Sequence, residues 1–180
     1  MIDDSNGQYL LLSCKNIKGG YLSFDTDERR INQETFEKLR KRTKLAKGDI
    51  LLSSVGTVGE MVLLNNEPSN YEFQRSVAMI KADPQFISSE FLYNSLLSQR
   101  EQIVNAAHGA VQQCLFLSDI ADFKTILPTK SIISDFSKIT KPLYDKIESN
   151  RQECLLLSNL RDSLLPKLMS GELDSTKAML

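Results

Sequence analysis

The C-terminal third of this 180-residue chain carries an apolar repeat with a helical period. From Ser131 onward, apolar side chains recur mostly three, four or seven residues apart, at Phe136, Leu143, Ile147, Cys154, Leu157, Leu160, Leu164 and Leu168. Such spacing is typical of the seam of a long amphipathic helix or a coiled coil. Residues 142–165 alone would span roughly 36 Å as a helix. A helix of this length needs a partner for its apolar seam, and packing on the chain's own globular part is the alternative.

Two prolines interrupt this repeat. Pro142 fits the first turn of a long helix behind a Thr140 cap, or else a kink. Pro166 is predicted to end or kink the helix near Leu164, and Gly171 is a natural stop.

The first 130 residues predict short strands and helices in alternation. Residues 9–13 and 21–24 read as strands of one hairpin, with Lys15 and Lys18 in the connection. A helix over residues 31–45 begins at an Asn32 cap. Ser88 or Ser89 caps a helix over residues 90–104, and Ser118 caps a short turn. Further strands are expected at residues 50–52, 61–64, 77–80 and 123–127. The fold class is therefore α+β: a small β-rich domain with flanking helices, then a long coiled-coil-forming helix.

The net charge of −1 conceals a basic region. Residues 15–47 contain ten Lys or Arg against five Asp or Glu. A local basic patch can bind phosphate even in a neutral chain. The alternative is a solvated helix face, because cations near a helix C-terminus stabilise the helix by themselves.

The three cysteines, Cys14, Cys114 and Cys154, are widely spaced and form no Cys/His cluster. This favours small apolar residues in a reducing compartment over a disulfide framework or a zinc site. The sequence lacks a signal peptide and any apolar run near 18 residues, so we expect a cytoplasmic protein that is not in a membrane.

Three segments resemble the DNA specificity (S) subunit of type I restriction-modification systems. They are LRKRTKL followed by KGDILLSSVGTVGE, then GAVQQCLFLSDIADFKTILP, and finally NRQECLLLSNLRDSLLPKLMSGELD. The last one matches the family's conserved helical region closely. Together they occur in the family's order and cover nearly the whole chain.

This resemblance implies a target recognition domain over residues 1–130 and a helical spacer or dimerisation region over residues 131–180. S subunits usually have two of each, so the chain is a natural half subunit, a split gene product or a fragment. Val111 and Cys114 also stand where the family more often has other residues. A half subunit would form a homodimer whose helices pair through Leu143, Ile147, Cys154, Leu157, Leu160 and Leu164.

The resemblance implies double-stranded DNA as ligand. Phosphate contacts are expected from the basic residues, and base contacts from side chains with paired donors and acceptors. The candidates are Lys15, Lys18, Arg40, Lys41, Arg42, Lys44, Ser54, Thr57, Gln74, Arg75, Gln112 and Gln113. Two alternatives stay open: Gln112 and Gln113 could cap a turn, and Arg75 could pair with Glu72.

No catalytic motif for adenine methylation, ATP hydrolysis or DNA cleavage is evident in the sequence, so we expect a non-catalytic subunit that binds no cofactor. The resemblance places S-adenosylmethionine, ATP and Mg²⁺ on partner subunits. It implies methyltransferase subunits as direct partners and the restriction subunit as an indirect one. A truncated module that binds methyltransferase subunits through its helix without reading DNA is the alternative function.

Overall fold

The computed structural model describes residues 7–24, 27–109 and 111–173. The chain divides into two compact units, residues 1–140 and 141–180. The long C-terminal helix starts at Lys130, and its first turns, up to residue 140, belong to the first unit. Within the described residues, no helix is long and apolar enough to cross a membrane.

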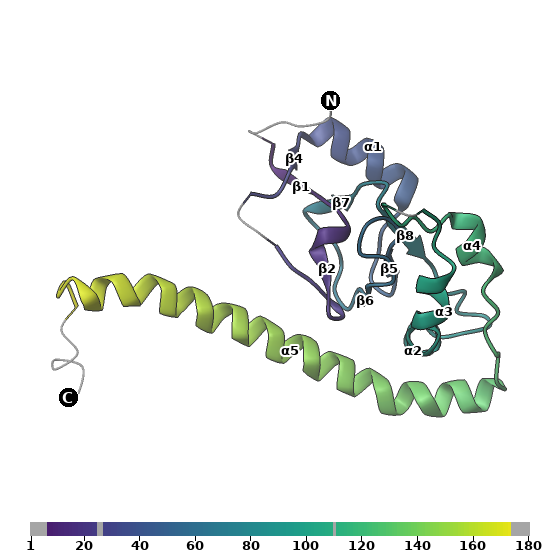
Figure 1. The fold of residues 1–180 in the computed structure, drawn as a ribbon. Coiled ribbons are helices and arrows are strands. Elements are labelled where there is room, and N and C mark those ends of the chain that lie inside the picture. Colours follow the sequence, from purple (N-terminus) through teal and green to yellow (C-terminus); the bar gives the residue numbers. More distant parts are fainter. Residues whose placement is uncertain (1–6, 25–26, 110, 174–180) are drawn as a thin grey trace. The chain divides into compact units, whose positions relative to one another are not determined.

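Small sheets build the first unit (Figure 1). One sheet has β1 (Tyr9–Leu12) between β4 (Arg30–Ile31), which is antiparallel to it, and β7 (Tyr71–Phe73), which is parallel. A second sheet has β5 (Ile50–Ser53) between antiparallel β6 (Met61–Leu63) and β8 (Val77–Ile80). A hairpin pairs β2 (Ile17–Lys18) with β3 (Tyr21–Leu22), and η1 (Cys14–Asn16) precedes it. The α+β fold class is thereby confirmed.

Helices flank the strands of this unit. They are α1 (Gln33–Thr43), α2 (Ser89–Ser98), α3 (Arg100–Asn105) and α4 (Leu117–Asp122). Figure 1 shows α1 and α2 on opposite sides of the strands. One core cluster contains Leu12, Ile17, Leu45, Leu51, Val62, Leu64 and Phe73, so residues from all three sheets share it.

The predicted helix caps at Asn32 and Ser88 are confirmed. The Asn32 side chain accepts a hydrogen bond from Thr35 N, and the Ser88 hydroxyl accepts one from Phe91 N. Each cap satisfies a backbone donor that the first helical turn leaves unpaired.

Three local predictions are wrong. Residues 9–13 and 21–24 do not form one hairpin, because β1 pairs with β4 and β7 while Tyr21–Leu22 pairs with Ile17–Lys18. Residues 123–127 form no strand, and Ile126 and Leu127 are exposed. Ser118 lies inside α4, whose N-cap is Phe116, and Asp119 accepts the hydrogen bond from Phe116 N.

The long helix α5 runs from Lys130 to Met169, 40 residues or about 60 Å. Its first turns pack on α2, where the rings of Phe136 and Phe91 lie edge to face with their centroids 5.2 Å apart. Ile133, also in these turns, is buried. Both prolines lie inside the helix, so Pro166 does not end it. The chain turns at Gly171 (φ +75°), as predicted, and Leu173 N donates to Lys167 O.

Candidate nucleic-acid interface

Three connections of the first unit are joined by main-chain hydrogen bonds. They are residues 54–57 between β5 and β6, residues 74–76 between β7 and β8, and residues 113–115. Ser54 N donates to Ser76 O at 2.9 Å, Gly56 N to Gln113 O at 3.1 Å, and Leu115 N to Ser54 O at 2.8 Å. We call this group of segments the loop cluster. It brings Gln74, Arg75 and Gln113 into one region.

The end of β1 is fastened to the same region. Gln74 N donates to Leu12 O at 2.9 Å, and Cys14 N donates to the Ser76 hydroxyl at 3.1 Å. Lys15 therefore follows directly on a residue bound to the loop cluster. Its ammonium lies 3.7 Å from the buried carboxylate of Glu28, so part of its charge is already balanced.

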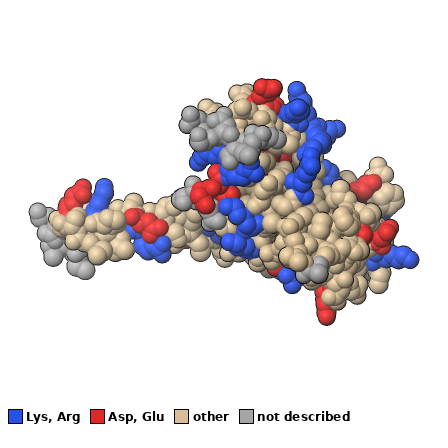
Figure 2. Space-filling model, turned by 45° about the horizontal axis from the view of Figure 1, so that its top comes forward, with Lys and Arg blue, Asp and Glu red and all other residues tan. Residues whose placement is uncertain are grey.

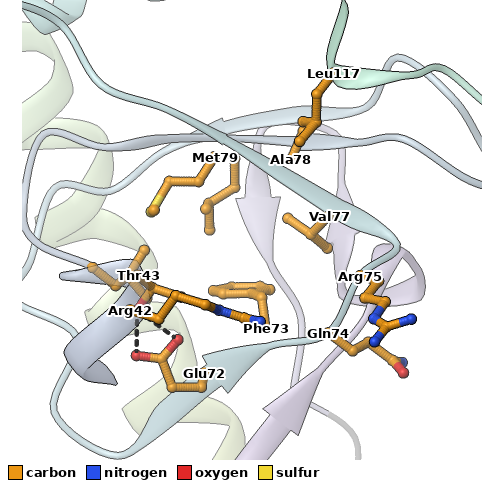
Figure 3. A pocket seen from close by; sticks show the side chains of 12 residues that line it. Arg42, Thr43, Glu72, Phe73, Gln74, Arg75, Val77, Ala78, Met79 and Leu117 are labelled. Atoms are coloured by element: carbon orange, nitrogen blue, oxygen red, sulfur yellow. Dashed lines mark hydrogen bonds between the residues drawn. The ribbon is translucent and has the colours of Figure 1, made fainter. Parts of the chain in front are cut away.

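A hollow of about 280 Å³ lies beside the loop cluster. Its floor is apolar and includes Leu51, Phe73, Val77 and Met79. Figure 3 shows Arg42 extending beside the Phe73 ring, with Gln74 and Arg75 at the opposite end. The hollow thus connects the C-terminal turn of α1 to the loop cluster.

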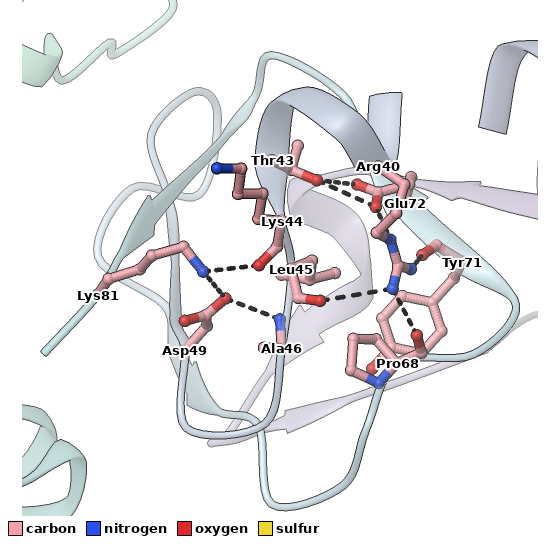
Figure 4. A network of polar contacts seen from close by, with 10 residues as sticks. All are labelled: Arg40, Thr43, Lys44, Leu45, Ala46, Asp49, Pro68, Tyr71, Glu72 and Lys81. Carbon is pink, nitrogen blue, oxygen red and sulfur yellow. Dashed lines mark hydrogen bonds and ion pairs between the residues drawn. The ribbon is translucent and has the colours of Figure 1, made fainter. Parts of the chain in front are cut away.

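The basic end of α1 divides into one structural arginine and exposed cations. Arg40 donates from Nε to the fully buried Glu72 carboxylate, and from Nη1 and Nη2 to Pro68 O at 2.7 Å and Tyr71 O at 2.8 Å (Figure 4). Lys41 and Arg42 are exposed. Arg40 therefore holds α1 to β7, and we remove it from the candidate DNA contacts that the sequence suggested.

The contacts of Glu72 decide whether this carboxylate pairs with Arg75, as the sequence suggested as an alternative. The Glu72 carboxylate accepts from Arg40 and from the Thr43 hydroxyl at 3.1 and 3.2 Å. Arg75 is exposed on the turn after β7. The hypothesis that Arg75 pairs with Glu72 is wrong, because Arg40 occupies that position.

Lys44 ends α1 in a left-handed conformation, with φ of +48°. Its carbonyl accepts from Lys81 Nζ at 2.9 Å, and Lys81 also pairs with Asp49 at 2.5 Å (Figure 4). The backbone of Lys44 is thus fixed while its side chain stays exposed. Figure 2 shows Lys and Arg side chains gathered on one part of the globular unit.

A tight loop carries the two glutamines. His108 and Cys114 exchange two backbone hydrogen bonds of 2.8 Å, which close the loop at its base. Gly109 has φ of +106°, and a Cβ there would lie 2.5 Å from Gln112 O, so only glycine fits. Val111, Gln112 and Gln113 are exposed at the tip.

The remaining predicted residues have different environments. Thr57 is exposed on the β5–β6 connection, whereas Ser54 is only 6% exposed and joins the loops through its main chain. We therefore assign Ser54 to the frame of the loop cluster and not to DNA contacts. Lys18 is exposed on the β2–β3 hairpin, where Gly19 N donates to Glu60.

The sequence analysis missed the hollow as a feature of the site. Val77 and Met79 lie two residues apart in β8 and therefore on one face of that strand, whereas Phe73 ends β7 in another sheet. The alternation in β8 was the available signal. Among the described residues, no group of three or more His, Cys, Asp or Glu is placed to hold a metal ion.

In the second unit, the six predicted seam residues of α5 are all exposed. Leu155 and Leu156 are exposed as well. Three consecutive exposed leucines project in three directions, since successive helical residues are about 100° apart. Helix α5 therefore has more apolar surface than a single narrow seam.

The fold and the site define a class of protein. It has a small α+β unit whose loops are joined by main-chain hydrogen bonds, followed by a long helix with an exposed apolar face. Residues 2–156 match the family model of the type I restriction modification DNA specificity domain, and the chain belongs to this family.

Curated relatives agree with this assignment. The chain is 36% identical over 83 residues to the type I restriction enzyme MjaIX specificity subunit of Methanocaldococcus jannaschii. It is 35% identical over 127 residues to the HindI specificity subunit of Haemophilus influenzae, and 30% over 139 residues to the EcoBI specificity subunit of Escherichia coli. These matches cover 46%, 69% and 74% of the chain but 19%, 27% and 29% of the relatives. The chain therefore matches less than a third of the length of each relative.

A solved structure shares the fold. The crystal structure of the S subunit of the type I restriction-modification system from M. genitalium superposes with a TM-score of 0.63 at 20% identity. The match covers 94% of this chain and 40% of that chain.

Proposed function

We propose that this chain is a non-catalytic DNA sequence-recognition module of a type I restriction-modification complex. One observation carries the proposal: main-chain hydrogen bonds hold Gln74, Arg75 and Gln113 in one loop cluster, next to the exposed cations at the end of α1. Membership of the DNA specificity family supports the same function.

The chemistry divides between two sets of side chains. Gln and Arg can make paired hydrogen bonds to the edges of adenine and guanine, so Gln74, Arg75, Gln112 and Gln113 are the proposed base readers. Lys41, Arg42 and Lys44 are the proposed phosphate contacts, which position the domain without reading sequence. Lys15, Lys18 and Thr57 remain candidates for additional backbone contacts.

A salt titration tests the phosphate contacts. Binding of a fluorescein-labelled 30-base-pair duplex of mixed sequence is measured by anisotropy from low to moderate salt. Each phosphate contact contributes a slope of about −0.9 in a plot of log K against log salt, so the double variant Lys41→Glu/Arg42→Glu should reduce the slope by about 1.8. Lys130→Glu/Lys138→Glu on α5 changes the net charge equally and is the matched control. Equal slopes for the two double variants would contradict the proposed surface.

We further propose that α5 assembles the complex. Its exposed apolar seam supports a homodimer of half subunits that reads a two-part target as a coiled-coil pair. The additional apolar surface at Leu155 and Leu156 supports docking of methyltransferase subunits, through which the restriction subunit joins. S-adenosylmethionine, ATP and Mg²⁺ then belong to those partners, and the complex acts in the cytoplasm.

The mass in solution tests the dimer. One chain has a mass of 20.3 kDa, so light scattering on a sizing column should give about 41 kDa for the dimer. A mass near that of one chain would refute the homodimer and favour a split subunit whose helix pairs with a different chain.

The alternative function is a truncated module that binds methyltransferase subunits but reads no DNA. The Lys41→Glu/Arg42→Glu variant separates the two functions when it is combined with a pull-down of the methyltransferase subunit. Loss of DNA binding with retained docking supports recognition. Wild-type protein that docks the subunit but binds no DNA at low salt supports the alternative.

A further inference from the structure

The seam of α5 contains two polar interruptions. A strict alternation of four and three residues through this seam takes positions 143, 147, 150, 154, 157, 161, 164 and 168, which share one face of the helix at about 100° per residue, while Leu160 flanks that face. Six are apolar or cysteine, while Asn150 and Arg161 are polar. Both polar residues are exposed, like the six others.

The two interruptions lie symmetrically about the centre of the seam. The midpoint of the eight positions falls between Leu155 and Leu156, and Asn150 and Arg161 are equally far from it. In a parallel pair each seam residue faces itself, so Arg161 would face a second Arg161 and the two charges would repel each other. In an antiparallel pair with full overlap, Asn150 of each copy faces Arg161 of the other.

From this symmetry we infer that Asn150 and Arg161 form two polar layers that fix the register of an antiparallel α5 homodimer. The remaining layers of that register are apolar or contain cysteine: Leu143 faces Leu168, Ile147 faces Leu164, and Cys154 faces Leu157. A slip of one heptad would place Arg161 against Leu143 or Leu157. An arginine without an acceptor in such a layer costs free energy that the symmetric register avoids.

The surroundings of Arg161 fit this layer. Its Nε donates to Asp162 at 2.7 Å, and this hydrogen bond holds the pKa of the exposed Asp162 carboxyl below its usual value. The guanidinium has further N–H donors, and the Asn150 side-chain carbonyl is a suitable acceptor. The inference rests on the homodimer of the proposed function.

Opposite charges at one position provide the test. Asn150→Glu places a carboxylate opposite Arg161 of the second copy, whereas Asn150→Lys places an ammonium there. Glu and Lys have similar helix propensities, so the two variants are matched controls for each other. The dimer dissociation constant of each full-length variant is measured by sedimentation equilibrium. Because the layer occurs twice, we expect about fivefold tighter association for Glu and about fivefold weaker association for Lys.

Every outcome is informative. If both variants weaken a dimeric protein equally, the inference is overturned while the homodimer stands, because a parallel pair or a slipped register predicts that result. If wild-type protein is monomeric at tens of micromolar, the homodimer and this inference both fail, while DNA recognition by the first unit is untouched.

Discussion

Replacing Arg40 with alanine should destabilise the first unit far more than replacing its exposed neighbour Arg42. Arg40 pairs with Glu72, whose side chain is fully buried, and donates to three backbone carbonyls. Removing one partner of a buried ion pair leaves an uncompensated charge and costs about 3–5 kcal/mol. The stacking of the Arg40 guanidinium 4.9 Å from the Phe36 ring adds about 0.5 kcal/mol.

Urea unfolding followed by tyrosine fluorescence measures this loss. Four of the five tyrosines precede residue 141, so the signal reports mainly on the first unit. With a slope of about 2 kcal/mol per molar urea, Arg40→Ala should lower the midpoint by roughly 1.5–2.5 M. Arg42→Ala, on the exposed face, should change stability by less than about 0.5 kcal/mol.

A second substitution identifies the cause. In the Arg40→Ala background, Glu72→Gln removes the buried charge and should restore about 1 kcal/mol or more, although it is destabilising alone. If Arg40→Ala unfolds at the same urea concentration as Arg42→Ala, Arg40 is not structural and it returns to the set of candidate DNA contacts.

Three further variants test a base contact, the α5 seam and a glycine of the β5–β6 connection. Arg75→Ala should relax the base preference at one or two positions of the target, as measured by selecting bound sequences from a random library. The slope of log K against log salt for this variant should differ from that of wild type by no more than one phosphate contact contributes. An unchanged base preference would remove Arg75 from the proposed base readers. Ile147→Glu should convert the proposed dimer to monomers because it would bury two charges in the seam, while Ser149→Glu, off the seam, should leave the mass unchanged. Gly59→Ala should lower the melting temperature by several degrees more than Gly56→Ala, because both glycines have positive φ but a Cβ at Gly59 would lie 2.5 Å from Val104; equal shifts would show that Val104 moves aside.

Local sequence signals predicted much of the fold. Asn32 and Ser88 cap their helices because a side-chain acceptor next to an apolar periodic segment meets the free backbone donors of the first turn. The pair β5–β6 follows from two apolar runs joined by a glycine-containing connection. These features depend on residues that are close in the sequence, from three apart in the caps to 13 apart for Ile50 and Leu63.

Long-range pairing was not predictable from the same signals. Residues 9–13 have the pattern of a hairpin strand, yet β1 takes the parallel strand β7 from some sixty residues away. Arg40 likewise appeared as one cation in a basic run, although its carboxylate partner lies 32 residues further along. Residues 123–127 have apolar side chains at three of five positions, but they pair with no strand within the described residues.

The main-chain hydrogen bonds of the loop cluster affect how the sequence preference of the proposed DNA surface could change in evolution. Ser54, Gly56, Gln113 and Leu115 are linked through backbone atoms, which every residue except proline supplies in full. Replacing Gln113 would therefore change the chemical surface offered to a ligand without removing a bond that holds the segments together. Such a scaffold tolerates mutation at the positions that contact the outside, so new preferences can arise by single substitutions while folding is preserved.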